Sequence, residues 1–395
     1  MPPPTLLSAH LRALCDSLSF STPSPGTRNA QNINPSHTAP RASNFETSLP
    51  QPERTVPPTV ATLEAPQLSA TTYAVAAEAR RGLSSTPKSL APWLFYDEPG
   101  SRLFEQITTL PEYYLTRTER DLFTTHADEI FASLDAHLTI AELGAGTASK
   151  TGVLLRALTR FQPHVLYQPI DISPTALDEA REQLERTISG VTVRPLIANY
   201  ITDSVRLERQ PRTRILALYI GSSIGNFSPT EARDILTRLR SELQPGDALL
   251  LGADLAPALA ANGRGKSVAT LLAAYNDSLG VTAAFNRNIL ARLNRELGAN
   301  FRPERFIHRA LWNPAHSRIE MHLESLAQQS ATIPANSSGP ALTLHFAAGE
   351  TIHTENSYKF TPAAIAALLA ASAFAPTRTF TDPKDLFAVT LATAL

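Results

Sequence analysis

The stretch Ile140-Ala-Glu-Leu-Gly-Ala-Gly-Thr-Ala-Ser-Lys150 decides the fold. The apolar run over residues 138–143 predicts a buried strand, and the residues from Ser149 onward predict an amphipathic helix. Gly144 and Gly146 lie between them, where glycine lets the backbone turn sharply and approach a ligand closely. The stretch therefore predicts the first strand, turn and helix of a nucleotide-type parallel sheet.

Strand and helix signals continue to alternate after this unit. Apolar strands are expected at residues 165–171, 191–198, 214–221 and 247–254, and helices capped by Ser173 and Ser228 at 173–187 and 228–243. This order predicts an α/β fold with a doubly wound, mainly parallel sheet covered by helices on both faces. Ligands of such folds bind beyond the carboxyl ends of the strands. The residues expected at that edge are 144–150, Asp171, Asn199, Tyr200 and 221–226.

The alternation stops after the fifth strand. Two helices are expected at residues 266–299 and antiparallel strands between 305 and 360. A helix at 362–371 and two final strands then complete the large sheet. We therefore expect a ligand-binding domain of residues 119–265 and 361–395, and a second α+β lobe built from residues 71–118 and 266–360.

Residues 1–70 differ in composition from the rest of the chain. Residues 1–66 hold 12 of the 31 prolines, together with much serine, threonine and asparagine. We expect a disordered tail, with a docking segment as the alternative. Deleting residues 1–66 is expected to leave function unchanged.

Composition narrows the classes of function. The 395 residues are 43% hydrophobic and carry a net charge of -1, so nothing favours binding to nucleic acid or to an anionic membrane. No apolar run is long enough to span a bilayer, and the N-terminus lacks the features of a secretory signal. The single cysteine, Cys15, cannot form an internal disulfide, which favours the cytoplasm. The ten histidines show no paired spacing, so no metal site is predicted, and we expect a monomer.

The glycine turn leaves two nucleotide-like cofactors to consider. A dinucleotide-binding turn needs a third glycine where Ser149 stands. The shorter turn suits S-adenosylmethionine, which has one adenosyl group and no pyrophosphate. Asp171, about 27 residues after Gly144, is placed at the end of the second strand to accept the two ribose hydroxyls. A purely structural turn is the remaining alternative.

A second glycine-rich segment, Gly263-Arg-Gly-Lys266-Ser267, has some features of a phosphate-binding loop. Ala260 stands where that loop needs glycine, and no strand ends directly before it. We therefore reject a phosphate loop here.

Polar residues alternate along an expected strand near the C-terminus. Glu355 and Ser357 are two apart, hence on one face together with His353 and Lys359. This face is either solvated or closes over the cofactor cleft, where it would offer a carboxylate and a hydroxyl to a small polar ring.

Eight blocks of sequence carry a resemblance to a known family. They are residues 95–101, 110–119, 142–147 with 150–151, 169–173, 218–226, 274–286, 318–321 and 354–360. In this order they resemble the histidine-specific N-alpha-methyltransferases of ergothioneine biosynthesis, from about residue 70 to the end of the chain. The resemblance implies the fold of the class I S-adenosylmethionine-dependent methyltransferases. It also implies conversion of L-histidine to its trimethylbetaine, hercynine.

By position, the resemblance implies two halves of one site. The residues that would bind S-adenosylmethionine are Tyr96, Gly144, Lys150, Asp171, Asn199 and Tyr200. Those that would bind the amino acid are Tyr113, Gly221, Asn226 and Tyr275 around its carboxylate and amine, and Met321, Glu355 and Ser357 around its imidazole. Of these, Tyr113, Asn226 and Tyr275 are expected to be catalytic.

One position departs from the family pattern, which usually has an acidic residue where Asn199 stands. An amide can both donate to and accept from an adenine edge, so a change in cofactor affinity rather than identity is expected.

A sulfonium methyl group is already activated, so positioning is the main task and no covalent nucleophile is expected. Two alternatives remain: the same fold acting on another aromatic amino acid, and a catalytically silent cofactor-binding protein.

Overall fold

The computed structural model describes residues 69–201, 203, 205–258 and 263–395. Residues 1–68 of the expected tail lie outside this part of the chain. Ser69 caps the first described helix, α2 (Ala70–Leu83), because its hydroxyl oxygen accepts a hydrogen bond of 3.1 Å from the Thr72 N–H. In the described ranges, no helix combines the length and the apolar character needed to cross a membrane.

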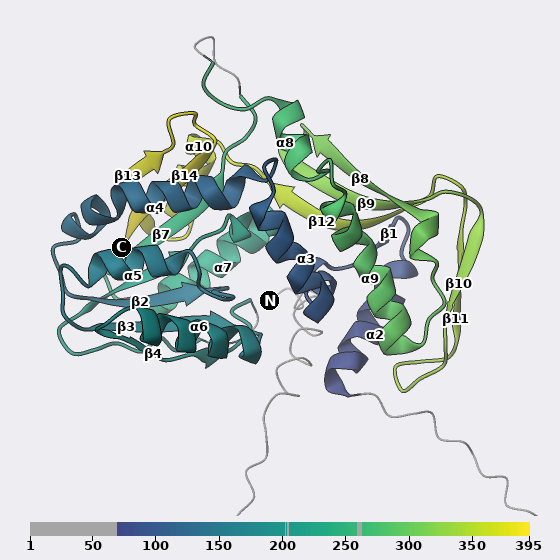
Figure 1. Ribbon diagram of the computed structural model, residues 1–395, viewed down its shortest axis with the longest axis horizontal. Helices are drawn as coiled ribbons and strands as arrows, with labels where there is room; N and C mark the ends of the chain where they lie inside the picture. Colours follow the sequence, from purple (N-terminus) through teal and green to yellow (C-terminus); the bar gives the residue numbers. More distant parts are fainter. Residues whose placement is uncertain (1–68, 202, 204, 259–262) are drawn as a thin grey trace, which may run out of the picture.

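The larger sheet has eight strands and is mainly parallel (Figure 1). Its order is β13-β14-β7-β6-β2-β3-β4, and β5 also pairs with β3. The strands are β2 (Leu138–Leu143), β3 (Val165–Asp171), β4 (Val191–Val193), β5 (Leu196–Ile197), β6 (Arg214–Tyr219), β7 (Ala248–Asp254), β13 (Phe374–Thr381) and β14 (Phe387–Ala394). The pairs β7–β14 and β13–β14 are antiparallel and the other pairs are parallel. The strand order reverses at β2, which confirms the predicted doubly wound α/β fold.

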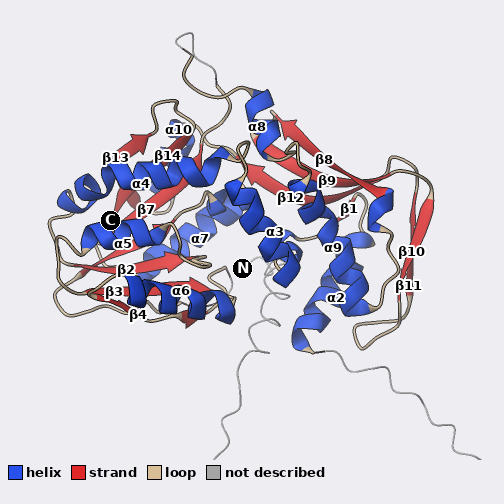
Figure 2. Ribbon diagram, viewed as in Figure 1, coloured by secondary structure: helices blue, strands red, loops and turns tan. Residues whose placement is uncertain are grey.

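Helices cover both faces of this sheet (Figure 2). They are α4 (Tyr114–Ala132), α5 (Thr151–Leu158), α6 (Pro174–Thr187), α7 (Pro229–Glu242) and α10 (Pro362–Ala371). All six residues of β2 are buried, as expected for a strand that is covered on both sides. The predicted caps Ser173 and Ser228 begin α6 and α7, and Ser228 forms a capping box with Glu231. Pro195, which has no N–H to donate, separates the expected third strand into β4 and β5.

The remaining elements form a second lobe beside the large sheet (Figure 1). Its four-stranded sheet has the order β1-β12-β9-β8, and a separate hairpin pairs β10 with β11. The strands are β1 (Lys88–Ser89), β8 (Phe306–Asn313), β9 (Arg318–Ser325), β10 (Gln329–Ile333), β11 (Leu342–Phe346) and β12 (Thr351–Tyr358). The helices are α2, η1 (Pro92–Phe95), α3 (Glu98–Thr109), α8 (Val268–Ala274), α9 (Val281–Leu297) and η3 (Pro303–Arg305). The two expected helices are confirmed, and β8, β9, β11 and β12 match the expected antiparallel strands, whereas β1 and β10 were not expected.

A β-bulge in β12 changes which face its residues occupy. His353 pairs with His322 of β9, but Glu355 pairs with the adjacent Met321, so Thr354 is the extra residue. Because neighbouring residues of β9 point to opposite faces, their partners His353 and Glu355 do so too. The expectation that His353 shares a face with Glu355 is therefore wrong. The imidazole rings of His322 and His353 instead lie together on the other face, with centroids 5.0 Å apart.

The end of β12 brings the second lobe to the carboxyl edge of the large sheet. The Phe360 N–H donates to the Asp254 carbonyl oxygen over 3.0 Å, next to a parallel bridge between Leu255 and Phe360. Gly225, in the turn after β6, lies so close to Tyr358 that a Cβ would come within 2.7 Å of the Tyr358 carbonyl oxygen. The end of β12 and the carboxyl edge of the large sheet are therefore in contact.

Candidate active site

The glycine turn after β2 contains two left-handed glycines. Gly144 has a φ of +67° and Gly146 a φ of +52°, values that favour glycine. The Gly144 N–H donates to the Ile170 carbonyl oxygen at 2.8 Å, and the Gly146 N–H donates to Asp171 Oδ2 at 3.0 Å. A Cβ at Gly146 would meet no atom within 4 Å, whereas one at Gly144 would face the Tyr200 ring at 3.4 Å. The backbone is therefore open to close approach at Gly146.

Asp171 lies at the end of β3, and each of its carboxylate oxygens accepts one backbone hydrogen bond. Oδ2 accepts from the glycine turn, and Oδ1 accepts from the residue that caps α6. Its Oδ1 accepts from the Ser173 N–H at 3.0 Å. Each carboxylate oxygen has a second lone pair, so the group can also accept two hydroxyl protons. Next to it, Ile172 and Ile197 are 39% and 50% exposed and present apolar surface. This combination of hydrogen-bond acceptors and apolar surface suits a ligand that carries both hydroxyl groups and a flat ring.

Asn199 and Tyr200 follow β5 at the same edge. Asn199 is buried, and its Oδ1 accepts from the Ile201 N–H at 3.0 Å. The amide nitrogen is thus the part of this side chain that offers a donor to a ligand. Tyr200 packs edge-on against Tyr219, with ring centroids 5.7 Å apart, and burial raises the pKa of Tyr200 to about 12. The Tyr200 hydroxyl therefore stays protonated at neutral pH.

A buried carboxylate links the glycine turn to the loop after β6. Glu119 of α4 accepts from Lys150 Nζ at 2.5 Å through Oε2 and from the Gly221 N–H at 2.7 Å through Oε1. Asn226 ends the same loop, in the short helix η2 (Ser223–Asn226). Glycine is required at position 252 of β7, because a Cβ on Gly252 would lie 2.1 Å from Glu119 Oε1. Sequence reasoning did not identify Glu119, although it ends one of the blocks that resemble the family.

A second buried polar cluster lies at the end of β12. The Lys359 ammonium donates to Asp254 Oδ2 at 2.8 Å, to the Tyr275 hydroxyl at 2.7 Å and to Ser357 Oγ at 2.9 Å. Lys266 donates to the other oxygen of Asp254, Oδ1, at 2.6 Å. Burial alone would raise the pKa of the Asp254 carboxyl, but Lys359 and Lys266 hold it below its usual range. Asp254 is therefore a buried anion between two buried cations.

Glu355 shares a face with Ser357, because the two alternate along β12 beyond the bulge. Burial raises the pKa of the Glu355 carboxyl to about 7, while nearby Lys359 acts in the opposite direction. The direct neighbour of Glu355 on β9, Met321, is 1% exposed and belongs to the hydrophobic core. The carboxyl group therefore changes charge near neutral pH and has an apolar side chain beside it.

Aromatic side chains from four segments form a series of ring contacts near this carboxyl group. The ring centroids of Tyr113 and Tyr275 lie 6.3 Å apart, and Phe104 lies 6.4 Å from Tyr113 and 5.8 Å from Tyr96. Burial raises the pKa of the Tyr113 and Tyr275 hydroxyls well above the usual range, and the Glu355 carboxylate adds to this shift. Loss of solvation and Glu355 also raise the pKa of Tyr96. The structure thus brings Tyr113, Tyr275 and Glu355 together, with Tyr96, which is 43% exposed, at the open side of the group.

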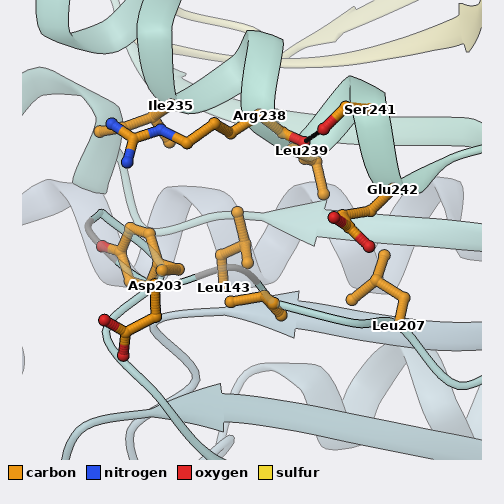
Figure 3. A pocket seen from close by; sticks show the side chains of 10 residues that line it. Leu143, Asp203, Leu207, Ile235, Arg238, Leu239, Ser241 and Glu242 are labelled. Atoms are coloured by element: carbon orange, nitrogen blue, oxygen red, sulfur yellow. Dashed lines mark hydrogen bonds between the residues drawn. The ribbon is translucent and has the colours of Figure 1, made fainter. Parts of the chain in front are cut away.

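A separate cavity of ≈ 220 Å³ lies on the α7 side of the large sheet (Figure 3). Its apolar lining includes Leu143, Val205, Leu207, Ile235 and Leu239. Of the predicted site residues, Tyr200 lines it, and the acceptor residues do not. Much of its wall comes from the C-terminal half of α7, away from the carboxyl ends of the strands. The cavity therefore adjoins the cofactor half of the site through Tyr200 and is separate from the acceptor half.

Sequence patterns did not identify three charged residues of the buried polar cluster at the end of β12, namely Asp254, Lys266 and Lys359. Asp254 ends the fifth strand as Asp171 ends the second, and that position is the signal for it. Lys359 is recognisable only as a neighbour of Glu355 on one strand face. Lys266 belongs to the rejected phosphate-loop segment, and its burial against Asp254 agrees with that rejection.

The chain matches one protein family over most of its length. The profile of the family described as histidine-specific, SAM-dependent methyltransferases matches residues 75–394. The histidine N-alpha-methyltransferase of Mycolicibacterium smegmatis is 40% identical over 316 residues, which are 80% of this chain and 93% of that protein. Ergothioneine biosynthesis protein 1 of Neurospora crassa is 34% identical over 220 residues, 54% of this chain and 23% of that protein. N-methyltransferase imqF of Aspergillus flavus is 32% identical over 245 residues, 60% of this chain and 64% of that protein.

Proposed function

Because the chain belongs to the family of histidine-specific, S-adenosylmethionine-dependent methyltransferases, we propose that it trimethylates the α-amino group of L-histidine to hercynine, the first step of ergothioneine biosynthesis. The observation that carries the choice of histidine is the position of Glu355. Its carboxyl group shares a strand face with the Ser357 hydroxyl, at the edge where the two sheets meet. A carboxylate and a hydroxyl two residues apart can bind the two nitrogens of one imidazole ring.

The carboxyl edge of the large sheet supplies the half of the site that would hold the methyl donor. Bound S-adenosylmethionine supplies a methyl group that its sulfonium has already activated. Asp171 would accept from the ribose hydroxyls, and the open backbone at Gly146 allows close approach. Lys150 offers a cation to the donor's carboxylate, and the Asn199 amide nitrogen offers a donor to the adenine edge. The residues present therefore fit the cofactor.

The second lobe supplies the half of the site that would hold the acceptor. Glu355 would accept from one imidazole nitrogen and Ser357 would face the other. Tyr113, Asn226 and Tyr275 would hold the carboxylate and the amine. An α-amine with a pKa of about 8 is partly deprotonated at neutral pH, so no dedicated base is required. Alignment of this amine with the methyl group is the protein's main contribution and is worth several kcal/mol.

Repeated methyl transfer turns the acceptor nitrogen into a permanent cation. The aromatic rings of Tyr96, Phe104 and Tyr113 contact one another edge to face, and Tyr113 is one of the residues proposed to hold the amine. The face of an aromatic ring attracts such a cation by about 0.5–2 kcal/mol. These rings therefore support three rounds of transfer rather than one.

A screen of amino acids tests the proposal against its alternatives. The protein is incubated with S-adenosylmethionine and each of the twenty amino acids, and mass spectrometry detects added methyl groups. We expect mono-, di- and trimethylated histidine. Methyl transfer to tryptophan or tyrosine in place of histidine would support the same fold acting on another aromatic amino acid. No product with any amino acid would support a silent cofactor-binding protein. The cytoplasmic location and the monomeric state remain predictions from the sequence.

A further inference from the structure

The Lys359 ammonium uses all of its hydrogen-bond donors inside the protein. A lysine has three N–H donors. At Lys359 each has an acceptor within 2.9 Å, namely Asp254 Oδ2, the Tyr275 hydroxyl and Ser357 Oγ. The side chain is 0% exposed. Lys359 therefore acts on a ligand only through the groups that it binds.

The two hydroxyls bound by Lys359 share one remaining proton. The Tyr275 and Ser357 oxygens are 2.9 Å apart, so one hydroxyl donates to the other and the pair has a single proton left for a ligand. When Tyr275 donates to Ser357, both lone pairs of Ser357 Oγ are occupied and this hydroxyl can only donate. A neutral imidazole has one N–H and one acceptor nitrogen, which match the Glu355 carboxylate and such a hydroxyl donor.

The formal charges of the buried side chains also favour an imidazole ring in its neutral form. When Glu355 is ionised, the cations Lys266 and Lys359 balance the anions Asp254 and Glu355. A neutral imidazole keeps this balance, whereas an imidazolium adds an uncompensated positive charge next to Lys359. The other titratable groups that face Glu355 are the hydroxyls of Tyr96, Tyr113 and Tyr275, whose raised pKa values keep them uncharged at neutral pH.

We infer that Lys359 is a positioning residue that orients the Ser357 and Tyr275 hydroxyls so that the site takes histidine with a neutral imidazole ring. The inference rests on the proposed function, because it concerns the same acceptor site. It assigns Lys359 to substrate specificity and not only to neutralising Asp254.

Lys266 provides a matched control for Lys359. It is 2% exposed and donates to the same Asp254 carboxylate, but its second bond goes to the Leu386 carbonyl oxygen at 2.6 Å. Lys359→Met and Lys266→Met each remove one buried cation, so a purely structural role would give similar effects. We expect KM for histidine to rise about 10- to 100-fold in Lys359→Met and at least about fivefold less in Lys266→Met, which removes one charge but leaves the three hydrogen bonds of Lys359 in place. The Kd for S-adenosylmethionine should stay the same in both, and equal changes in KM would contradict the inference.

The wild-type protein tests the form of the ring without any substitution. 1,2,4-Triazol-3-ylalanine has a ring N–H and an acceptor nitrogen, but its ring stays neutral at pH values where imidazole is protonated. We expect the ratio of kcat/KM for histidine to kcat/KM for this analogue to fall about 10-fold between about pH 7.5 and 5.5, because an imidazole is half-protonated near about pH 6.5. A ratio that does not change with pH would overturn the inference, whether or not Lys359→Met folds. In folded Lys359→Met the decrease should be smaller.

Different experimental results would contradict the inference and the proposed function. No methyl transfer to histidine at any pH would contradict the proposed function. Methyl transfer to histidine with a pH-independent ratio would contradict only the selection of the neutral ring.

Discussion

Glu355 of β12 and Met321 of β9 are direct antiparallel neighbours, even though His353, two residues before Glu355, lies on the opposite face of the sheet. The bulge residue Thr354 causes this reversal, and its hydroxyl donates to the Met321 carbonyl oxygen at 3.0 Å. The bulge places Glu355 beside the tyrosines at the meeting point of the two sheets. It leaves His353 with His322 on the other face.

The first prediction concerns Glu355. Glu355→Ala should raise KM for histidine by about 10- to 100-fold, because the ring N–H of the bound imidazole would lose its acceptor. The Kd for S-adenosylmethionine, measured by calorimetry, should change less than about twofold. Glu320→Ala is the control, because it removes a carboxylate of β9 from the opposite face of the same sheet. Equal loss of histidine and cofactor binding in Glu355→Ala would contradict the assigned role.

The second prediction concerns the glycine turn. Gly146→Ala places a methyl group where the cofactor is proposed to approach, and should raise the Kd for S-adenosylmethionine by at least about 10-fold. Gly349→Ala is the matched control, since Gly349 also has a positive φ, +79°, and open space around its Cβ position, but lies between β11 and β12. Backbone strain of about 1–2 kcal/mol should lower Tm in both variants. Unchanged cofactor binding in Gly146→Ala would exclude the turn from the site.

The third prediction concerns Asp171. Asp171→Ala removes the proposed acceptor of the ribose hydroxyls and the partner of the Gly146 N–H, so the Kd for S-adenosylmethionine should rise about 10- to 100-fold. The control is Asp178→Ala in the following helix, which removes a surface ion pair with Arg181 and should change neither Kd nor Tm measurably. Matching Kd values for the two variants would show that Asp171 does not contact the cofactor.

The fourth prediction links Glu142 to stability. Burial raises the pKa of the Glu142 carboxyl to about 7, although Thr151 and Tyr167 donate to it. Because the folded-state pKa is raised, this group's contribution to stability is complete below its unfolded pKa of about 4.3 and is lost as pH rises through about 7. Tm should therefore decrease between about pH 5 and 8.

Glu142→Gln should make this decrease smaller, because glutamine keeps an oxygen that can accept from Thr151 and Tyr167 but carries no charge. Glu355, whose pKa is also about 7, contributes a decrease of the same sign, so Glu142→Gln alone should not remove it completely. Scanning calorimetry across this pH range measures the slope. An identical slope in wild type and Glu142→Gln would show that Glu142 titrates normally.

Local sequence signals were sufficient to predict the part of the fold that forms the cofactor half of the site. The two glycines after β2, the acid that ends β3 and the caps Ser173 and Ser228 each act within a few residues, so the sequence alone predicts them. The prediction of where α4 starts was less accurate. From the sequence alone, Thr118 is a plausible N-cap for a helix that starts near residue 119, whereas the helix begins at Tyr114 and has no side-chain cap.

The acceptor half depends on contacts that no local pattern encodes. Lys359 is far along the chain from Asp254 and Lys266, and it meets Asp254 only because the end of β12 lies against the carboxyl edge of the large sheet. The bulge at Thr354 also has no signature in the alternation of polar and apolar residues. A strict period of two therefore gave the correct face for Ser357 and Lys359 relative to Glu355, and the wrong one for His353.

The most direct test of the account is to locate the transferred methyl groups. The protein is incubated with L-histidine and S-adenosylmethionine that carries a deuterated methyl group, and the product is fragmented in a mass spectrometer. We predict three deuterated methyl groups on the α-nitrogen, detected as loss of fully deuterated trimethylamine. Methyl groups on the imidazole ring, or unmodified histidine, would contradict the central claim.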